Sequence, residues 1–289
     1  MVIRTCLARS PSIPINAIRG DGQLPRDDIP LLAPGGTIFL WEPFIGLAGN
    51  TSGPDFMNEA FSANPQLRSL SDAVTLHGYD AYPPSSEPES AGPDLGTTNV
   101  QLGDKVAQMK ATFTAAGTSP GKPVWLTEIG WPTYVPVDEG TQARWLIRSI
   151  ALAALNGVDL MYIYNMYDGP SGPLGTPSAS PEDHFGLVNH DGKEKQAYTA
   201  IRFFMQKLGS YRVQSRIPAH DSKNSVYIVQ MADANGHQAW VVWDSIEAGT
   251  GFTWKLPANA TCSGFSGGTC HVNNGELAVD STPVYVMAH

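Results

Sequence analysis

The sequence predicts an α/β fold in which a parallel sheet is followed by a small all-β sandwich. Between residues 36 and 209, short apolar runs alternate with longer segments of helical periodicity, which is typical of a parallel α/β sheet. After Gly209, apolar and polar residues alternate with period two between glycine-rich turns, which is typical of a β-sandwich. With 289 residues, 42% of them hydrophobic, the chain can bury a core in both parts.

The elements of the α/β part are predicted in order along the chain. Residues 1–35 are rich in proline without a sustained period, and we expect them to be irregular. The elements expected after them are a strand-like run over 37–47, a helix over 54–61, a strand over 72–77, a helix over 100–116, a strand over 124–128, a helix over 138–156, a strand over 159–165 and a helix over 195–208. Asp138 is expected to cap the long helix, and Gly209 to end the last one.

The β part is predicted from its alternation and its turns. The expected strands cover 226–230, 239–243, 252–256, 275–279 and 283–287, and a turn over 233–236 joins the first two. The predicted organisation is therefore an irregular segment over 1–35, an α/β portion over 36–209 and a sandwich domain over 210–289. Trp240, Trp243 and Trp254 are interpreted chiefly as sandwich core, with sugar binding as the alternative.

Composition excludes several classes of partner. The formal net charge of -9 and the absence of a basic stripe argue against binding to nucleic acid. No apolar run approaches the roughly 20 residues of a membrane span, so no membrane partner is expected. No signal peptide is visible at the start of the sequence.

The cysteines bear on the compartment. Cys262 and Cys270 flank a glycine-rich segment and are expected to form a disulfide that staples a hairpin; the alternative is two free thiols. A disulfide favours an extracellular or periplasmic location. Cys6 is left over.

The segment from Thr127 to Trp131 carries the functional signal. It follows the apolar run over 122–126, so Glu128 is expected at the C-terminal end of a buried parallel strand. In a (β/α) barrel the catalytic residues lie at that end of the strands. A glutamate there, beside an aromatic side chain, suits the hydrolysis of glycosides. The alternative is a loop glutamate that caps the next element.

Several motifs occur along the chain, over residues 126–131, 77–79, 164–168 and 185–188, followed by Gly192 and Ala197-Tyr198. Together they resemble the second half of clan A glycoside hydrolases, and family 39-like enzymes are the most similar group that we identify. The resemblance covers roughly residues 36–289. It implies a (β/α)8 barrel followed by a β-sandwich, of which this chain would hold strands 5–8, that is, a partial TIM-type barrel.

The resemblance also implies roles for individual residues. Glu128 matches the strand-7 nucleophile, so the implied reaction is retaining hydrolysis of O-glycosidic bonds in a carbohydrate substrate. His77 and Tyr79 match the strand-6 element that lines the sugar site, and the strand-8 end is matched by Asn165 and Tyr167, with Tyr164 as the alternative aromatic.

Other residues are assigned to the site from the sequence itself. Tyr79, Tyr82 or Tyr164 could donate a hydrogen bond to the Glu128 carboxylate, and Tyr82 opens a long loop that would shape the cleft. Trp131 is a candidate sugar platform, or alternatively a tryptophan that covers the barrel rim. For His77 the alternative is a packed strand-end histidine.

The acid/base glutamate is where the sequence departs from the clan pattern. The clan places it at the end of strand 4, and residues 1–35 are too few to encode four βα units. Glu42, in Trp41-Glu42-Pro43, is a weak candidate. The alternative function is therefore a catalytically impaired relative that binds carbohydrate. Two copies could also self-associate through the open barrel edge.

No cofactor and no metal site are expected. The histidines lack the spacing of metal-binding motifs. The segment 264–268 matches G-x-S-x-G, but it lies in the β part rather than on a strand–turn–helix, so it does not predict a nucleophilic serine.

Overall fold

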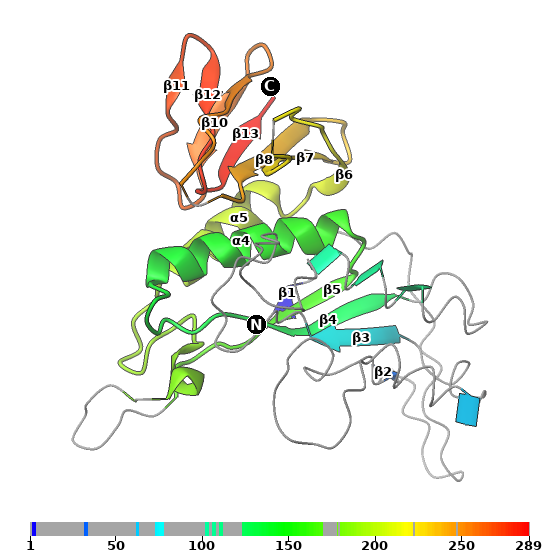
Figure 1. Ribbon diagram of the computed structural model, residues 1–289, viewed down its shortest axis with the longest axis vertical. Helices are drawn as coiled ribbons and strands as arrows, with labels where there is room; N and C mark the ends of the chain where they lie inside the picture. The colour runs from blue at the N-terminus through cyan, green and yellow to red at the C-terminus, as the bar shows by residue number, and fades with distance from the viewer. Residues whose placement is uncertain are drawn as a thin grey trace.

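The structure is a computed structural model arranged in layers. It describes residues 123–169, 178, 180–221, 223–246 and 248–288, with short segments at 2–3, 32–33, 62–63, 73–77, 102–103, 106–107 and 110–111. Figure 1 shows that helices α4 and α5 lie between an α/β sheet and a β-sandwich. One hydrophobic cluster contains residues from the sheet, from both helices and from the sandwich, so the three layers share a core.

The α/β sheet has the strand order β1-β5-β4-β3-β2. The strands are β1 (Val2–Ile3), β2 (Leu32–Ala33), β3 (Ala73–His77), β4 (Val124–Ile129) and β5 (Leu160–Ile163). Strands β2 to β5 are parallel, and β1 pairs antiparallel with β5. Val124, Leu126 and Met161 are buried, which explains why β4 and β5 read as apolar runs. The carboxyl ends of the parallel strands meet at one edge.

Helices α4 (Glu139–Leu155) and α5 (Gln196–Leu208) form the middle layer. Asp138 caps α4 as predicted, since its Oδ1 accepts a hydrogen bond of 2.7 Å from the Thr141 N–H. Gly209 ends α5 as predicted, and its N–H donates to the carbonyl of Met205 at 3.0 Å. Helix α4 buries residues on most of its circumference because sheets lie on both sides of it.

The β part contains two antiparallel sheets. One has the order β10-β13-β8-β7-β6 and the other β11-β12-β9. The strands are β6 (Arg212–Arg216), β7 (Val226–Ala232), β8 (Gln238–Asp244), β9 (Thr253–Lys255), β10 (Thr261–Gly264), β11 (Val272–Asn273), β12 (Glu276–Ala278) and β13 (Val284–Met287).

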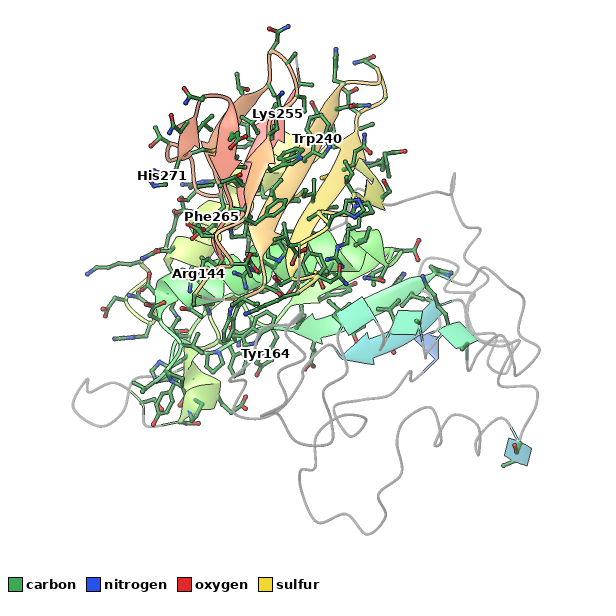
Figure 2. All side chains as sticks on the ribbon, turned by 45° about the horizontal axis from the view of Figure 1, so that its top comes forward. Arg144, Tyr164, Trp240, Lys255, Phe265 and His271 are labelled. Atoms are coloured by element: carbon green, nitrogen blue, oxygen red, sulfur yellow. A yellow bond between two sulfur atoms is a disulfide. The ribbon has the colours of Figure 1, made fainter. Side chains whose placement is uncertain are left out.

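Alternation along β8 divides its tryptophans between two cores. Trp243 belongs to the cluster shared with the helices, whereas Trp240 belongs to the cluster between the two sheets of the sandwich (Figure 2). Trp254 contacts Trp240 edge to face, with ring centroids 5.8 Å apart. The interpretation as core is therefore confirmed for Trp240 and Trp243, whereas Trp254 is only partly buried.

The predicted disulfide between Cys262 and Cys270 is present, with their Cα atoms 5.9 Å apart. The loop that it closes is fastened by a 2.7 Å hydrogen bond from the Gly264 N–H to the Gly268 carbonyl. Phe265, at the tip, packs against the cluster shared with the helices (Figure 2).

The structure corrects the sequence analysis in two respects. Strands β1 and β2 lie within the segment expected to be irregular, because a two-residue strand is too short to produce a periodic pattern. Strands β6, β10 and β11 were not predicted, since none of their residues is buried and they lack an apolar alternation. The expected strand over 37–47 and the helix over 54–61 lie outside the described residues, and the helix over 100–116 is described only in short helical pieces.

Candidate functional site

Three predicted site residues lie at the same edge of the α/β sheet. In the parallel register between β3 and β4, His77 pairs with Glu128, beside a shift in register after Leu76. On the other side of β4, the N–H of Tyr164 donates to the carbonyl of Ile129 at 2.9 Å, so Asn165 follows directly beyond the end of β5. The backbone thus brings His77, Glu128 and Asn165 to consecutive strand ends.

Glu128 is half-buried near the end of β4. Two residues later, Gly130 is buried where the chain passes close to β5. A Cβ atom on residue 130 would collide with the backbone carbonyl oxygen of Tyr164, which a shift of a side chain could not relieve. The glycine in Glu128-Ile129-Gly130-Trp131 therefore serves the close approach of two chain segments.

Trp131 is buried in the core. Only 3% of its surface is exposed, and its ring meets that of Trp145 in α4 edge to face, with centroids 5.7 Å apart. Its carbonyl accepts a 2.8 Å hydrogen bond from Nε2 of the buried Gln142. A tryptophan so enclosed does not present a face to a sugar in this structure, so its environment supports the packing alternative.

The aromatic residues after β5 differ in exposure. Tyr167 is 61% exposed. Tyr164 lies edge to face with Phe185, with centroids 5.3 Å apart (Figure 2). Asn165 lies between Tyr164 and Tyr167 in the sequence, and its backbone N–H donates to the Phe185 carbonyl at 3.2 Å. Its side-chain Oδ1 is buried without a hydrogen-bond partner among the described residues. Of these two tyrosines, Tyr167 is the more accessible.

The remaining candidates are described only in part. The backbone of His77 is described within β3. Tyr79, Tyr82 and Glu42 lie outside the described residues.

Glu182 is a carboxylate that the sequence analysis did not single out. It lies in the 3-10 helix η4 (Pro181–His184), which leads into the segment that pairs with the residues after β5. Its side chain is exposed, but partial desolvation by the surrounding protein raises the pKa of its carboxyl group, and the negative charges of Asp183 and Glu128 raise this pKa further. The sequence does not predict that Glu182 and Glu128 interact electrostatically, because Glu182 does not belong to a predicted strand.

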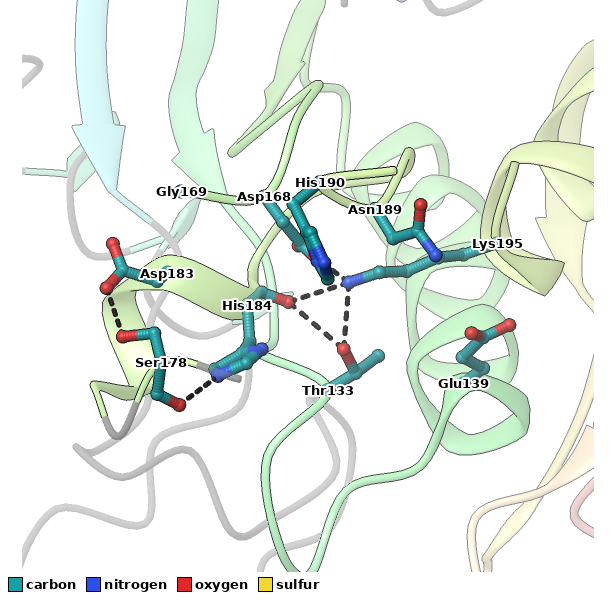
Figure 3. A pocket seen from close by; sticks show the side chains of 10 residues that line it. All are labelled: Thr133, Glu139, Asp168, Gly169, Ser178, Asp183, His184, Asn189, His190 and Lys195. Atoms are coloured by element: carbon teal, nitrogen blue, oxygen red, sulfur yellow. Dashed lines mark hydrogen bonds and ion pairs between the residues drawn. The ribbon is translucent and has the colours of Figure 1, made fainter. Parts of the chain in front are cut away.

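A buried ion pair between Lys195 and Asp168 lies beside a pocket of about 170 Å³ (Figure 3). The pocket is lined by Thr133, Glu139, Asp168, Gly169, Ser178, Asp183, His184, Asn189, His190 and Lys195. The pair itself was not predicted. Asp168 stands in the motif after β5, but nothing in the sequence indicates that Lys195 is buried against it.

Searches for metal sites and membrane spans were negative within the described residues. No group of three or more histidine, cysteine, aspartate or glutamate side chains there could hold a metal ion. In the same part of the chain, no helix combines the length and the apolarity that crossing a bilayer requires.

Of the comparisons with known proteins, only the one with solved structures found similar proteins. No protein-family model and no curated protein sequence matches the chain. The structure is similar to a family 39 glycoside hydrolase from Bacteroides cellulosilyticus WH2, with a TM-score of 0.63 and 18% identity over 83% of this chain and 50% of that chain. It is also similar to the family 51 arabinofuranosidase from Xanthomonas axonopodis pv. citri, with a TM-score of 0.53 and 10% identity over 94% of this chain and 60% of that chain.

The chain has a glycosidase-like fold. At these identities the similarity concerns the fold alone, and the chain spans only half of the family 39 enzyme. The resemblance stated from the motifs thus agrees with the structural neighbours at the level of the fold. The assignment of the sheet to barrel strands 5–8, the domain boundaries and the roles of the site residues stay predictions.

Proposed function

We propose that this chain is a glycoside hydrolase that cleaves O-glycosidic bonds with retention of configuration, with Glu128 as the nucleophile. The observation that carries the proposal is the position of Glu128 at the end of a parallel strand, in register with His77, in a fold similar to that of two glycosidases. Chemistry in (β/α) barrels takes place at this end of the strands. The substrate is a carbohydrate, and no nucleic acid, membrane or cofactor takes part.

The proposed reaction has two steps. The carboxylate of Glu128 attacks the anomeric carbon while the bond to the leaving oxygen breaks and a second carboxylic acid protonates that oxygen. Water then hydrolyses the glycosyl ester with the same second residue as base. His77, Tyr79, Tyr82, Asn165 and Tyr167 are the proposed contacts to the sugar.

Two residues are candidates for the proton donor. Glu42 lies within the predicted run over 37–47 and remains the weak candidate from the sequence, because the clan pattern places the donor at the end of strand 4. Glu182 is favoured by electrostatics, since partial desolvation and the nearby charges raise the pKa of its carboxyl group, as a group that must carry a proton needs. A donor would have to approach Glu128 to about 5–5.5 Å when the substrate is bound.

The proposal is tested by intact-mass analysis after incubation with a panel of activated 2-fluoro-glycosides. Their good leaving groups need little help from an acid, so they report on the nucleophile alone. We expect a glycosyl adduct on Glu128 that is absent from the Glu128→Gln variant. Glu276→Gln is the matched control, because Glu276 is exposed on β12 in the sandwich, and it should retain the adduct.

Other outcomes separate the alternatives. An adduct that forms normally in Glu42→Gln or Glu182→Gln, together with slow turnover of substrates with poor leaving groups, would identify that residue as the proton donor. No adduct from any sugar, in a protein shown to be folded by circular dichroism, would contradict catalysis and favour the carbohydrate-binding alternative.

A further inference from the structure

The ammonium group of Lys195 joins three separate segments of the chain. Its Nζ donates to Asp168 Oδ1 at 2.7 Å, to Thr133 Oγ1 at 2.8 Å and to the His184 carbonyl at 3.0 Å (Figure 3). A lysine has three N–H donors, and here each has an acceptor. Lys195 is therefore saturated by the protein itself, which argues against a role as an anion-binding group in the adjacent pocket.

The three segments are those that flank the proposed site. Thr133 belongs to the loop that leaves β4 after Glu128, and Asp168 to the loop that leaves β5 after Asn165. His184 ends η4, the helix that contains Glu182. Direct bonds tie the same segments together: the Thr133 N–H donates to the His184 carbonyl at 2.9 Å, and the Gly186 N–H donates to Asp168 Oδ1 at 2.8 Å. Lys195 is the common point of this network.

This position is costly for a cation. The side chains of Lys195 and Asp168 are only 3% and 6% exposed. Lys195 is also the N-cap residue of α5, where the helix dipole disfavours positive charge. Burial lowers the pKa of its ammonium group, against the opposing effect of Asp168. A well-packed apolar pair is often as stable as a buried ion pair, so stability alone does not explain why charge is placed here.

The directions of the hydrogen bonds do explain why a charged pair is placed here. Apolar contacts fill space without fixing orientation, whereas three hydrogen bonds from one charged group define the positions of three acceptors. Departures from local sequence rules are expected where function sets the geometry. We propose that Lys195 and Asp168 are positioning residues, which hold the loops after β4 and β5 and helix η4 in the arrangement that the Glu128 site requires. This inference rests on the proposed function for its role in the reaction.

The test combines one readout that needs no activity with one that does. Four variants are compared: Lys195→Met, Lys195→Arg, Asp168→Asn and the control Arg202→Met. Arg202 belongs to α5 as well, but its ion pair with Glu194 is exposed, with the two side chains 51% and 44% accessible. Asp168→Asn retains a side-chain oxygen that can accept from the Gly186 N–H. This milder variant keeps the test valid if Lys195→Met fails to fold.

Hydrogen exchange measured by mass spectrometry is the first readout. We expect Lys195→Met and Asp168→Asn to speed amide exchange at least tenfold in residues 130–137, 164–169 and 181–188, with strands β7 and β8 unchanged. Arg202→Met should match the wild type. Unchanged exchange in the three segments, or an equal increase throughout the chain, would overturn the inference, because a general stabilising pair would act on the whole fold.

The rate of adduct formation on Glu128 is the second readout. Displacement of catalytic groups by about 1 Å can cost about a hundredfold in rate. We expect Lys195→Met to lower the maximal rate constant of adduct formation by about that factor, with little change in the concentration for half-saturation, and Lys195→Arg to recover part of it. A full rate in Lys195→Met would refute the positioning role. If the wild type forms no adduct, the proposed function fails, while the exchange readout still decides whether the pair holds the loops.

Discussion

Asp138 and Lys195 stand at the N-termini of neighbouring helices and carry opposite charges. Asp138 accepts the Thr141 N–H and agrees with the dipole of α4. Lys195 makes no such cap, and Glu139 of α4 serves α5 in its place, since its Oε2 accepts the Gln196 N–H at 3.1 Å. The N-terminus of α4 is thus capped by its own Asp138. The N-terminus of α5 is capped by Glu139 of α4, and the Lys195 side chain bonds to the loops instead.

The cap of α4 gives a prediction with a defined pH dependence. Asp138→Ala should lower the free energy of unfolding by about 1 kcal/mol. The hydrogen bond from the Thr141 backbone N–H is the main cause that lowers the pKa of Asp138 below its ordinary value of 3.8. The carboxylate therefore contributes stability that is fully present above pH 3.8 and is lost as the pH falls through the lowered pKa.

Urea unfolding at several pH values checks this prediction. The difference between the wild type and Asp138→Ala should shrink below pH 3.8. Asp138→Asn is the control, because an asparagine is also a good N-cap but does not titrate. A difference between wild type and Asp138→Ala that stays constant into acid would contradict the assignment of the cap to the ionised carboxylate.

Among the elements, helix α4 is packed against neighbours on several sides. It contacts α5 beside it, the sheet on one side and the sandwich on the other. Arg148 is fully buried in this helix and donates to the backbone carbonyls of Asp244 and Ser281 in the sandwich. Burial lowers the pKa of its guanidinium, and the charges of Asp244 and Asp280 oppose that effect. The arginine therefore acts as a polar link between the helix layer and the sandwich.

Loss of this link should be severe. We expect Arg148→Met to lower the free energy of unfolding by about 3 kcal/mol, because it leaves buried carbonyls and nearby carboxylates without the cation. Arg144→Met, one turn earlier on the same helix and only half-buried, is the control and should cost less. Equal losses in the two variants, measured by urea unfolding, would show that the link to the sandwich is not what Arg148 contributes.

For the whole molecule, the shared core means that the helices depend on both sheets. Tyr285 of β13 is fully buried, lies nearly parallel to Phe203 of α5 and meets Phe204 edge to face. Tyr227 and Trp243 stack with centroids 4.7 Å apart in the same cluster. The sandwich therefore covers an apolar surface of the helix layer.

Self-association is the prediction at this scale. Within the described residues, β1 pairs only with Met161 and Tyr162 of β5, and β2 only with Ala73 and Val74 of β3. An open sheet edge presents backbone groups that can pair with a strand of another chain. We expect light scattering to show a mass that rises from monomer toward dimer as the protein concentration increases. A monomer mass over the whole concentration range would contradict this expectation.

The sequence by itself determined the order and type of the main elements. Buried strands and amphipathic helices leave local periodic patterns, so β3, β4, β5, α4, α5 and the larger sandwich strands were predictable within a few residues. The resemblance of the motifs to clan A glycoside hydrolases implied that His77, Glu128 and Asn165 belong to one site, and the strand ends bring the backbones of these residues to the same edge of the sheet. The Cys262–Cys270 disulfide followed from spacing in the same way.

Only the tertiary structure decided which side chains face inward at that edge. The burial of Trp131 against α4, the ion pair of Lys195 with Asp168 and the contact of Arg148 with the sandwich join residues that are distant in sequence. The local sequence does not show that a polar residue is buried. The free-energy cost of burying it is offset by hydrogen-bonding or charged partners from distant parts of the chain. The spacing of residues along the chain therefore predicts the elements, whereas the partners of buried polar groups depend on how those elements pack.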